Sequence, residues 1–313
     1  MIVRERPSAL RLFLIVRGSI LPRIRTTLIV NTLIATLVTW CHGTLFDHKV
    51  ILTTIPFTLI GLPLAIFLGF RNTAAYDRYW EGRKLWGELV LRSRNFSRQC
   101  QSMIAGDTVA HAKLGLDDVR VRMVCRTIAF CHALRHQLRD SKPGADLQPL
   151  LRPGEWALAC KSSNPSDYLM QQMGHDLATC VREKRIDTIL AAQLDNSISA
   201  MVGAGASCER IRGTPIPFSY SLLLHRTAYL YCFLLPFGLV DSLGFMTPFV
   251  VAIVAYTFFG LDALGDEIEE PFGEDANDLP LSAICRTIEI NLRESLQDEQ
   301  VPPPMQPENF MLT

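Results

Sequence analysis

The sequence predicts an all-α membrane protein, with four transmembrane helices per subunit and a large helical region outside the membrane. Two observations predict this class. Apolar residues gather in two pairs of segments, each near the length that crosses a hydrocarbon core: 26–43 and 48–70, then about 227–243 and 245–262. Between them, Leu, Arg, Ala and Val recur at helical spacing, and no stretch alternates apolar and polar residues as a strand does.

Charge placement predicts the orientation of the chain. Residues 1–25 contain six arginines against one acid, Glu5, and such basic segments stay in the cytoplasm. Four crossings then place the loop His42–Lys49 and the turn 241–247 outside, and both chain ends in the cytoplasm. The expected order is a cytoplasmic N-terminal segment (1–25), the first two transmembrane helices (26–70), a cytoplasmic helical region (71–226), the last two transmembrane helices (227–262) and a cytoplasmic C-terminal segment (263–313).

The stretch Leu10–Val16 follows a basic start and could be mistaken for a signal peptide. It is too short for one, contains Arg11, is followed directly by Arg17 and lacks a small-residue cleavage site. We therefore expect an amphipathic helix that lies on the membrane or on a neighbouring subunit.

Long helices are expected after the second apolar segment. No proline occurs from 64 to 142, so the second transmembrane helix continues into the cytoplasm. The run ends at 141–144, and Asn164 followed by Pro165 marks a new helix start. Further helices are expected at 165–185, 187–210 and 282–297, and the tail from Asp298 is expected to be disordered or to lie over a neighbour.

Several classes of function find no support in the composition. Lys+Arg and Asp+Glu balance at 31 each, so a nucleic-acid partner is not expected. The nine cysteines form no CxxC pair and none lies at zinc spacing with a histidine, so no metal, disulfide or other cofactor is expected. The polar block after residue 70 contains no serine or cysteine beside a base, so the protein is not expected to be an enzyme.

That polar block follows the second apolar segment directly. It contains Phe70-Arg71-Asn72-Thr73, Ala75-Tyr76-Asp77-Arg78 and Trp80-Glu81-Gly82-Arg83-Lys84-Leu85-Trp86-Gly87. Hydrocarbon cannot solvate these charges, so the span ends near Phe70. A second motif, Pro271-Phe272-Gly273-Glu274-Asp275, follows the last apolar segment. In this order the two motifs resemble the signature of the bestrophin family of pentameric ion channels, over about residues 10–295.

The polar block has two interpretations. As an interfacial anchor, its aromatic residues would lie at the membrane surface while its arginines and lysines reach water. We favour a structural role, in which the block holds the neck and the subunit interface, over direct contact with ions. The residues concerned are Arg71, Asn72, Asp77, Arg78, Trp80, Glu81, Arg83 and Trp86.

Leu62, Ile66 and Phe70 recur at intervals of four, within about 80° of one another on one helical face. From spacing alone, this face is ordinary lipid-facing or packing surface. The resemblance implies instead that the second span lines a central pore, with these residues as a hydrophobic neck that excludes ions by denying them hydration. It also implies a second constriction at the cytoplasmic end, where the nearest match is Ile186, with core packing as the alternative.

The acidic run after the second motif departs from the family pattern. Animal bestrophins carry a nearly continuous acidic cluster there that binds calcium. Here Ala276 and Asn277 stand at two of the expected acidic positions, which leaves fewer carboxylates than calcium prefers. Calcium activation is not expected, and Asp278 is expected to act as a solvated cap before the last helix.

The resemblance implies a homopentameric channel in the cell inner membrane, with permeant ions and membrane lipid as its partners. Anions such as chloride are the expected ions. Cation conduction stays open, because apolar rings have no sign of charge. Acids near the ends of the last two spans could contribute to it, although each is better explained as a partner for Arg or Lys: Asp241, Asp262, Asp266 and Glu267. The rival interpretation is a membrane-anchored scaffold or sensor whose cytoplasmic helices bind a partner protein.

Overall fold

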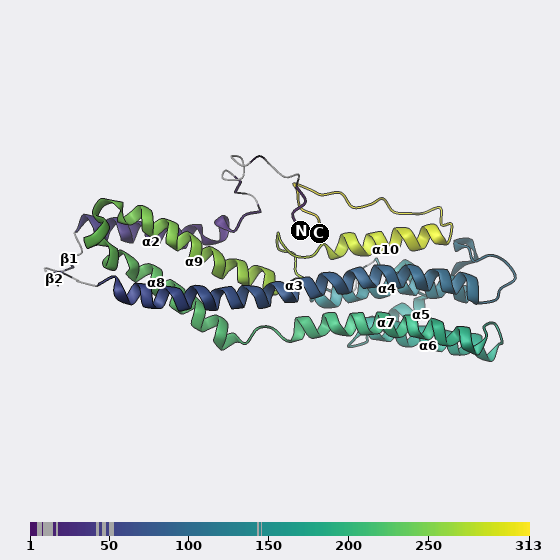
Figure 1. The fold of residues 1–313 in the computed structure, drawn as a ribbon. Helices are drawn as coiled ribbons and strands as arrows, with labels where there is room; N and C mark the ends of the chain where they lie inside the picture. The colour runs from purple at the N-terminus through teal and green to yellow at the C-terminus, as the bar shows by residue number, and fades with distance from the viewer. Residues whose placement is uncertain are drawn as a thin grey trace. The chain divides into compact units, whose positions relative to one another are not determined.

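The computed structural model describes residues 1–4, 8, 15–16, 18–41, 44–45, 48–49, 53–142, 144 and 146–313. Helices account for most of these residues, as Figure 1 shows, so the expected helical class is confirmed. The loop expected at His42–Lys49 carries one small antiparallel hairpin, β1 (Thr44–Leu45) with β2 (His48–Lys49). Most of the helix expected at Leu10–Val16 lies outside the described residues.

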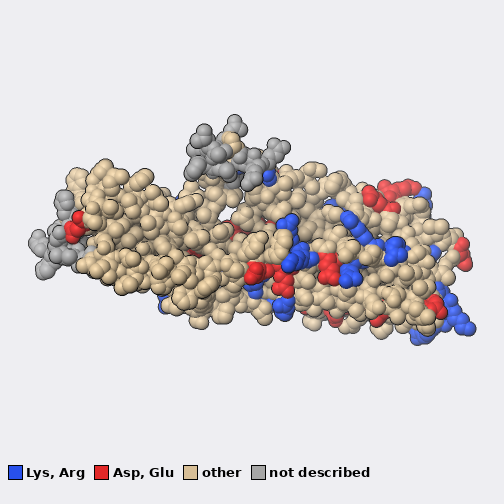
Figure 2. Space-filling model, in the orientation of Figure 1, with Lys and Arg blue, Asp and Glu red and all other residues tan. Residues whose placement is uncertain are grey.

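The chain folds as two compact units. The first, here called the apolar unit, comprises Arg4–Tyr79 and Pro215–Pro271. The second, the polar unit, comprises Met1–Val3, Trp80–Thr214 and Phe272–Thr313. In Figure 2 the Lys, Arg, Asp and Glu side chains gather over the polar unit, while the visible described surface of the apolar unit carries few of them.

The apolar unit consists of α2 (Leu21–Trp40), the first part of α3 (Ile55–Met103), α8 (Phe218–Leu243), η3 (Gly244–Met246) and α9 (Thr247–Glu269). Three described stretches are long and apolar enough to cross a membrane: Leu21–Trp40, Ile55–Met103 and Phe218–Glu269. The last contains both α8 and α9. They are separated at Gly244, whose φ of 49° lies in the left-handed region that favours glycine.

Small clusters of buried side chains hold the helices of the apolar unit together. Leu64 and Leu68 of α3 pack against Leu224 and Ala228 of α8. Gly238 of α8 lets α3 approach closely, because a Cβ at this position would collide with the ring of Phe57. Two further clusters join the helices, one of Ala35, Phe57, Leu235 and Val251, and one of Ile24, Cys232, Ala255, Phe259 and Ala263.

The polar unit contains the second part of α3 together with η1 (Ala112–Asp117), α4 (Val119–Leu138), η2 (Gln148–Leu150), α5 (Pro153–Ala159), α6 (Pro165–Arg182), α7 (Thr188–Gly213) and α10 (Leu281–Ser295). The expected start of α6 is confirmed, since the Asn164 side chain accepts a 3.0 Å hydrogen bond from the Asp167 backbone N–H. Asp187 caps α7 in the same way. Helix α5 lies between the expected helices, and none was expected there.

The C-terminal tail is ordered against its own unit. The backbone N–H of Val3 donates to the Phe310 carbonyl at 2.8 Å, and that of Leu312 donates to the Met1 carbonyl at 2.9 Å. The Ala283 N–H, in the first turn of α10, donates to Thr313 at 2.8 Å. The last residues of the tail therefore pair with residues 1–3 and with α10 of the same chain, an arrangement that was not expected for this segment.

Candidate functional site

The first part of α3 has one packed face and one open face. Leu64 and Leu68 are buried, with 3% and 0% of their surfaces exposed. Leu62, Ile66 and Phe70 are 67%, 47% and 62% exposed. The three residues expected to form a neck therefore share an apolar face that no other described segment of the chain covers. A face of this kind is available to lipid, to another subunit or to a pore.

The residue after this face, Arg71, is buried among carboxylates from α9. Its guanidinium lies 2.9 Å from Asp262 Oδ1 and 3.7 Å from Glu269 Oε2, and it also pairs with Asp266. The Arg71 side chain is only 1% exposed. A buried charge is tolerated when it is paired this closely, so Arg71 fixes the position of α3 against α9.

Helix α8 joins the same cluster through His225, whose Nδ1 lies 2.7 Å from Asp262 Oδ2. We call these five residues, Arg71, His225, Asp262, Asp266 and Glu269, the Arg71 cluster. The expectation that Asp262 and Asp266 are partners for arginine is confirmed. The cluster ties α3, α8 and α9 together at the end of the exposed neck face.

Other signature residues support this junction. The Asn72 amide donates to the Leu261 carbonyl at 3.0 Å, and Arg78 Nε donates to the Glu269 carbonyl at 3.1 Å. Gly265 admits the Asn72 side chain, because a Cβ at residue 265 would collide with its amide oxygen. Asn72 and Arg78 therefore contact the same helix, α9, that pairs with Arg71.

The two sequence motifs that carry the family resemblance meet in the polar unit. Phe272 of the second motif packs on Gly82 of the first, where an added Cβ would lie 2.9 Å from the phenyl ring. Arg139, the C-cap residue of α4, donates from Nε to the Phe272 carbonyl at 3.1 Å, and its NH1 lies 3.3 Å from Glu274 Oε1. Trp86, on the same helix as Gly82, is fully buried. The motifs are therefore parts of one packed structure.

Of the remaining signature residues, Asp77 is exposed on α3 in the apolar unit, and Trp80, Glu81 and Arg83 lie toward the surface of the polar unit. Trp80 is partly exposed, with the Arg83 guanidinium carbon 5.1 Å and the Lys84 Nζ 5.8 Å from its ring centroid. Glu81 pairs with Arg210 at 2.7 Å. Exposed pairs of this kind stabilise a protein little.

The acidic segment turns back on itself. The Asp275 N–H donates to Asp278 Oδ2 at 2.7 Å, and Asp278 is buried. Asp278 therefore does not act as a solvated cap, and Pro280 occupies the N-cap of α10. Among the described residues, no group of three or more His, Cys, Asp or Glu side chains is arranged to hold a metal ion. The absence of calcium activation stays a prediction.

Ile186 packs in the core of the polar unit, with 6% exposed, which agrees with the alternative of core packing. Three residues later, in the first turn of α7, Ile189 is 74% exposed. The helix start explains the difference, because Asp187 caps α7 and turns the chain between the two isoleucines. Which isoleucine side chain is exposed therefore depends on where α7 begins, and the second constriction stays a prediction.

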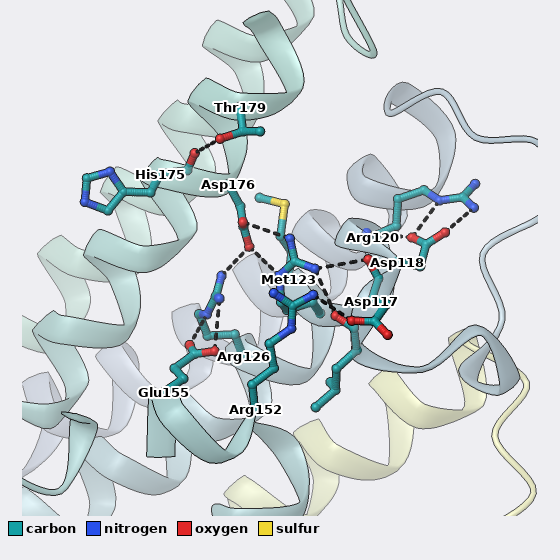
Figure 3. A network of polar contacts seen from close by, with 12 residues as sticks. Asp117, Asp118, Arg120, Met123, Arg126, Arg152, Glu155, His175, Asp176 and Thr179 are labelled. Atoms are coloured by element: carbon teal, nitrogen blue, oxygen red, sulfur yellow. Dashed lines mark hydrogen bonds and ion pairs between the residues drawn. The ribbon is translucent and has the colours of Figure 1, made fainter. Parts of the chain in front are cut away.

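A network of ion pairs that the sequence did not reveal joins α4 to α5 and α6, as Figure 3 shows. Arg122 contacts both carboxylate oxygens of Asp176 at 2.8 Å. Arg126 pairs with Asp176 at 2.8 Å and with Glu155 at 2.5 Å. Burial alone would raise the pKa of Asp176, but the hydrogen bonds from the two arginines hold this pKa below its ordinary value.

Comparison with known proteins agrees with this architecture. The family model described as Bacterial/Fungal Bestrophin protein matches residues 1–294. A voltage-dependent anion channel-forming protein of Mesorhizobium japonicum is 42% identical over 311 residues, which cover 98% of this chain and 95% of that protein. The voltage-dependent anion channel-forming protein YneE of Escherichia coli strain K12 is 38% identical over 315 residues, covering 100% of both.

A solved structure is also similar. The crystal structure of a bacterial bestrophin homolog from Klebsiella pneumoniae has a TM-score of 0.80 and 37% sequence identity, and the match covers 88% of this chain and 99% of that one. The fold and the two motifs define a membrane protein of bestrophin type. The chain belongs to the bacterial and fungal bestrophin family, so the resemblance found in the sequence is confirmed.

Proposed function

We propose that the protein is a subunit of an anion channel that conducts ions passively through a central pore. The relatives named as anion channel-forming proteins match it over nearly their whole length, which supports this function. The long apolar stretches support a position in the cell inner membrane. The proposal assigns the protein no catalytic step.

The exposed face of α3 carries the proposal. Leu62, Ile66 and Phe70 form an open apolar stripe, whereas Leu64 and Leu68 on the opposite face are packed against α8. In a ring of subunits, one such stripe from each would form stacked apolar rings. These rings close a pore when they exclude water, because an ion inside them would lose its hydration shell.

The pore requires several copies of the chain. One pore-facing helix per subunit cannot enclose a channel, so a closed ring is needed, and the family resemblance suggests five subunits. Native mass measurement of the detergent-solubilised protein should give the mass of a pentamer. Monomers or dimers alone would contradict this assembly.

The proposed topology has four spans, α2, α3, α8 and α9, with both chain ends in the cytoplasm. The break at Gly244 supports counting α8 and α9 as two crossings, and the basic residues before α2 support a cytoplasmic N-terminus. The polar unit then forms the cytoplasmic part. Labelling of single cysteines at the two chain ends, from outside intact cells, should fail if this topology is correct.

A second constriction is proposed at the start of α7. A constricting residue must expose its side chain to the pore, and Ile189 meets this requirement while Ile186 does not. The role expected for Ile186 is therefore proposed for Ile189. Replacing Ile189 with alanine should change relative anion permeability, whereas replacing Ile186 should mainly reduce stability by creating a cavity.

Reconstitution tests the function. Purified protein in liposomes with a chloride gradient should conduct ions. The reversal potential measured under bi-ionic conditions should have the sign expected for anion permeation. The reversed sign would mean that the channel passes cations. The absence of any flux would favour the rival, a membrane-anchored scaffold. Calcium chelation should leave the flux unchanged, because the acidic segment lacks the full set of carboxylates.

A further inference from the structure

A buried histidine of α4 lies between two carboxylates in the polar unit. His132 is 3% exposed. Its Nδ1 lies 3.3 Å from Asp146 Oδ2, in the turn before η2, and its Nε2 lies 3.5 Å from Glu289 Oε2, on α10. One imidazole ring therefore faces a carboxylate at each of its nitrogens, and each carboxylate comes from a different element.

This geometry indicates a charged ring. A neutral imidazole carries a proton on one nitrogen only, so the other would present its lone pair to a carboxylate oxygen. Among the residues that the structure describes, neither ring nitrogen has a hydrogen bond that would relieve this repulsion. With both nitrogens protonated, the ring instead makes two favourable ion pairs. Burial of the imidazolium is then compensated by its partners.

The two carboxylates have further partners of fixed charge. Asp146 also pairs with Arg135 at 2.6 Å and faces the imidazole of His136 at 3.2 Å. Glu289 lies 3.0 Å from Arg293 and 3.6 Å from Arg286. Burial alone would raise the pKa values of both carboxyl groups, but they lie below their ordinary values, that of Asp146 through hydrogen bonds from His132 and His136, and that of Glu289 through His132 and Arg293. His132 is the buried group in this cluster that changes charge near neutrality.

We infer that His132 makes the contact of α4 with α10 and with the Asp146 turn sensitive to pH, with the contact tight when the ring is charged. Burial alone would lower the pKa of His132, but the two carboxylates raise it above the ordinary value. A raised pKa in the folded state stabilises the protein fully below the unfolded value of about 6.5. This stabilisation is lost as the pH rises through the folded pKa. The cluster is therefore a device that loosens α10 on the alkaline side.

The apolar side chains of α10 carry no charge that changes with pH, so their packing should hold α10 equally well at every pH. Leu281, Cys285, Ile288 and Leu292 of α10 are all buried, and Cys285 Sγ donates to the Cys131 carbonyl at 3.4 Å. Burial raises the pKa of the Cys285 thiol well above its ordinary value, so this thiol stays neutral when His132 loses its proton. Loosening of α10 with rising pH is thus assigned to His132.

Hydrogen exchange of the full-length protein in detergent tests this inference without depending on ion conduction. Protection of α10 peptides, corrected for the intrinsic exchange rate, should fall several-fold between about pH 6 and about pH 9, because the raised pKa of His132 is crossed in this interval. The variant H132Q should show low protection at both pH values, whereas H132K should remove the pH dependence while keeping the charge. H175Q, which alters an exposed histidine of α6, is the matched control and should behave as the wild type does.

Two results would overturn the inference. The first is wild-type α10 protection that does not change between the two pH values, a measurement that stands even where a variant fails to fold. The second is an H132Q protein that retains both the protection and the pH dependence of the wild type. Retention of the pH dependence in H132Q would point to His136, the other imidazole on Asp146.

Discussion

The apolar unit and the polar unit both bury arginine side chains, but they pair them differently. In the apolar unit, Arg71 is a single guanidinium that faces three carboxylates of α9. In the polar unit, Arg122 and Arg126 of α4 share Asp176, and each also has other acceptors. The first arrangement depends on one cation, while the second distributes its charges over a network.

This difference predicts how each unit responds to the loss of one charge. Removal of a central cation leaves several buried carboxylates facing one another, whereas removal of one network member leaves the others with partners. The apolar unit depends on the single cation Arg71 because few other polar side chains lie among its helices. In the polar unit, Arg122 and Arg126 each have an acceptor besides Asp176, so each keeps a partner when Asp176 is lost.

The largest effect is therefore expected for Arg71→Met. Loss of the guanidinium leaves Asp262 buried with His225 as its remaining partner, and the free energy of unfolding should fall by about 3–5 kcal/mol. Thermal unfolding followed by size-exclusion fluorescence measures this change. Adding Asp262→Leu to Arg71→Met should recover part of the loss, and a wild-type unfolding temperature in Arg71→Met would show that the cluster is not the junction described.

A smaller effect is expected for Asp176→Asn in the network of the polar unit. Arg126 keeps Glu155, and Arg122 keeps the carbonyls of Leu116 and Asp117, so the cost should be about 1–3 kcal/mol. Because the folded pKa of Asp176 is lowered, wild type should lose this stabilisation as the pH falls below about 4, and the variant should not.

The matched control for the network is Glu183→Gln, an exposed acid at the end of α6, whose effect should lie within about 0.5 kcal/mol. If Asp176→Asn proves as damaging as Arg71→Met, the distinction between a central cation and a shared network fails.

More local effects are expected at two glycines of α3 in the polar unit. Gly82→Ala pushes a methyl group against the Phe272 ring, so it should cost about 1–3 kcal/mol and disturb the contact between the two motifs. Gly87→Ala meets no atom within 4 Å and should stabilise the helix by about 0.5–1 kcal/mol. Denaturant unfolding of the pair measures both, and equal responses would show that the Phe272 contact does not constrain Gly82.

The sequence predicts much of this structure where the causes are local. The helix starts at Asn164 and Asp187 depend on a cap and its next few residues, and both are confirmed. The shared face of Leu62, Ile66 and Phe70 follows from helical spacing, and these side chains lie together on an open surface. Family membership was predicted from two motifs that occur in the order typical of the family.

Contacts between distant residues are what the sequence leaves open. Nothing near Arg71 in the chain identifies Asp262 and Glu269 as its partners, since these residues belong to the last apolar helix. The burial of Ile186 depends on the exact start of α7, and the order of the C-terminal tail depends on hydrogen bonds to residues 1–3. The position of His132 between two carboxylates likewise requires three separate elements to meet.

The most direct test of the account measures chloride flux through the neck. Liposomes containing the triple variant Leu62→Ala, Ile66→Ala, Phe70→Ala should conduct about tenfold more than wild type, a change that needs a barrier lowered by only about 1.4 kcal/mol. The control, Leu64→Ala with Leu68→Ala, removes packing against α8 and should lower stability without raising flux. Unchanged flux in the triple variant, with raised flux in the control, would contradict the claim that the exposed face of α3 lines the pore.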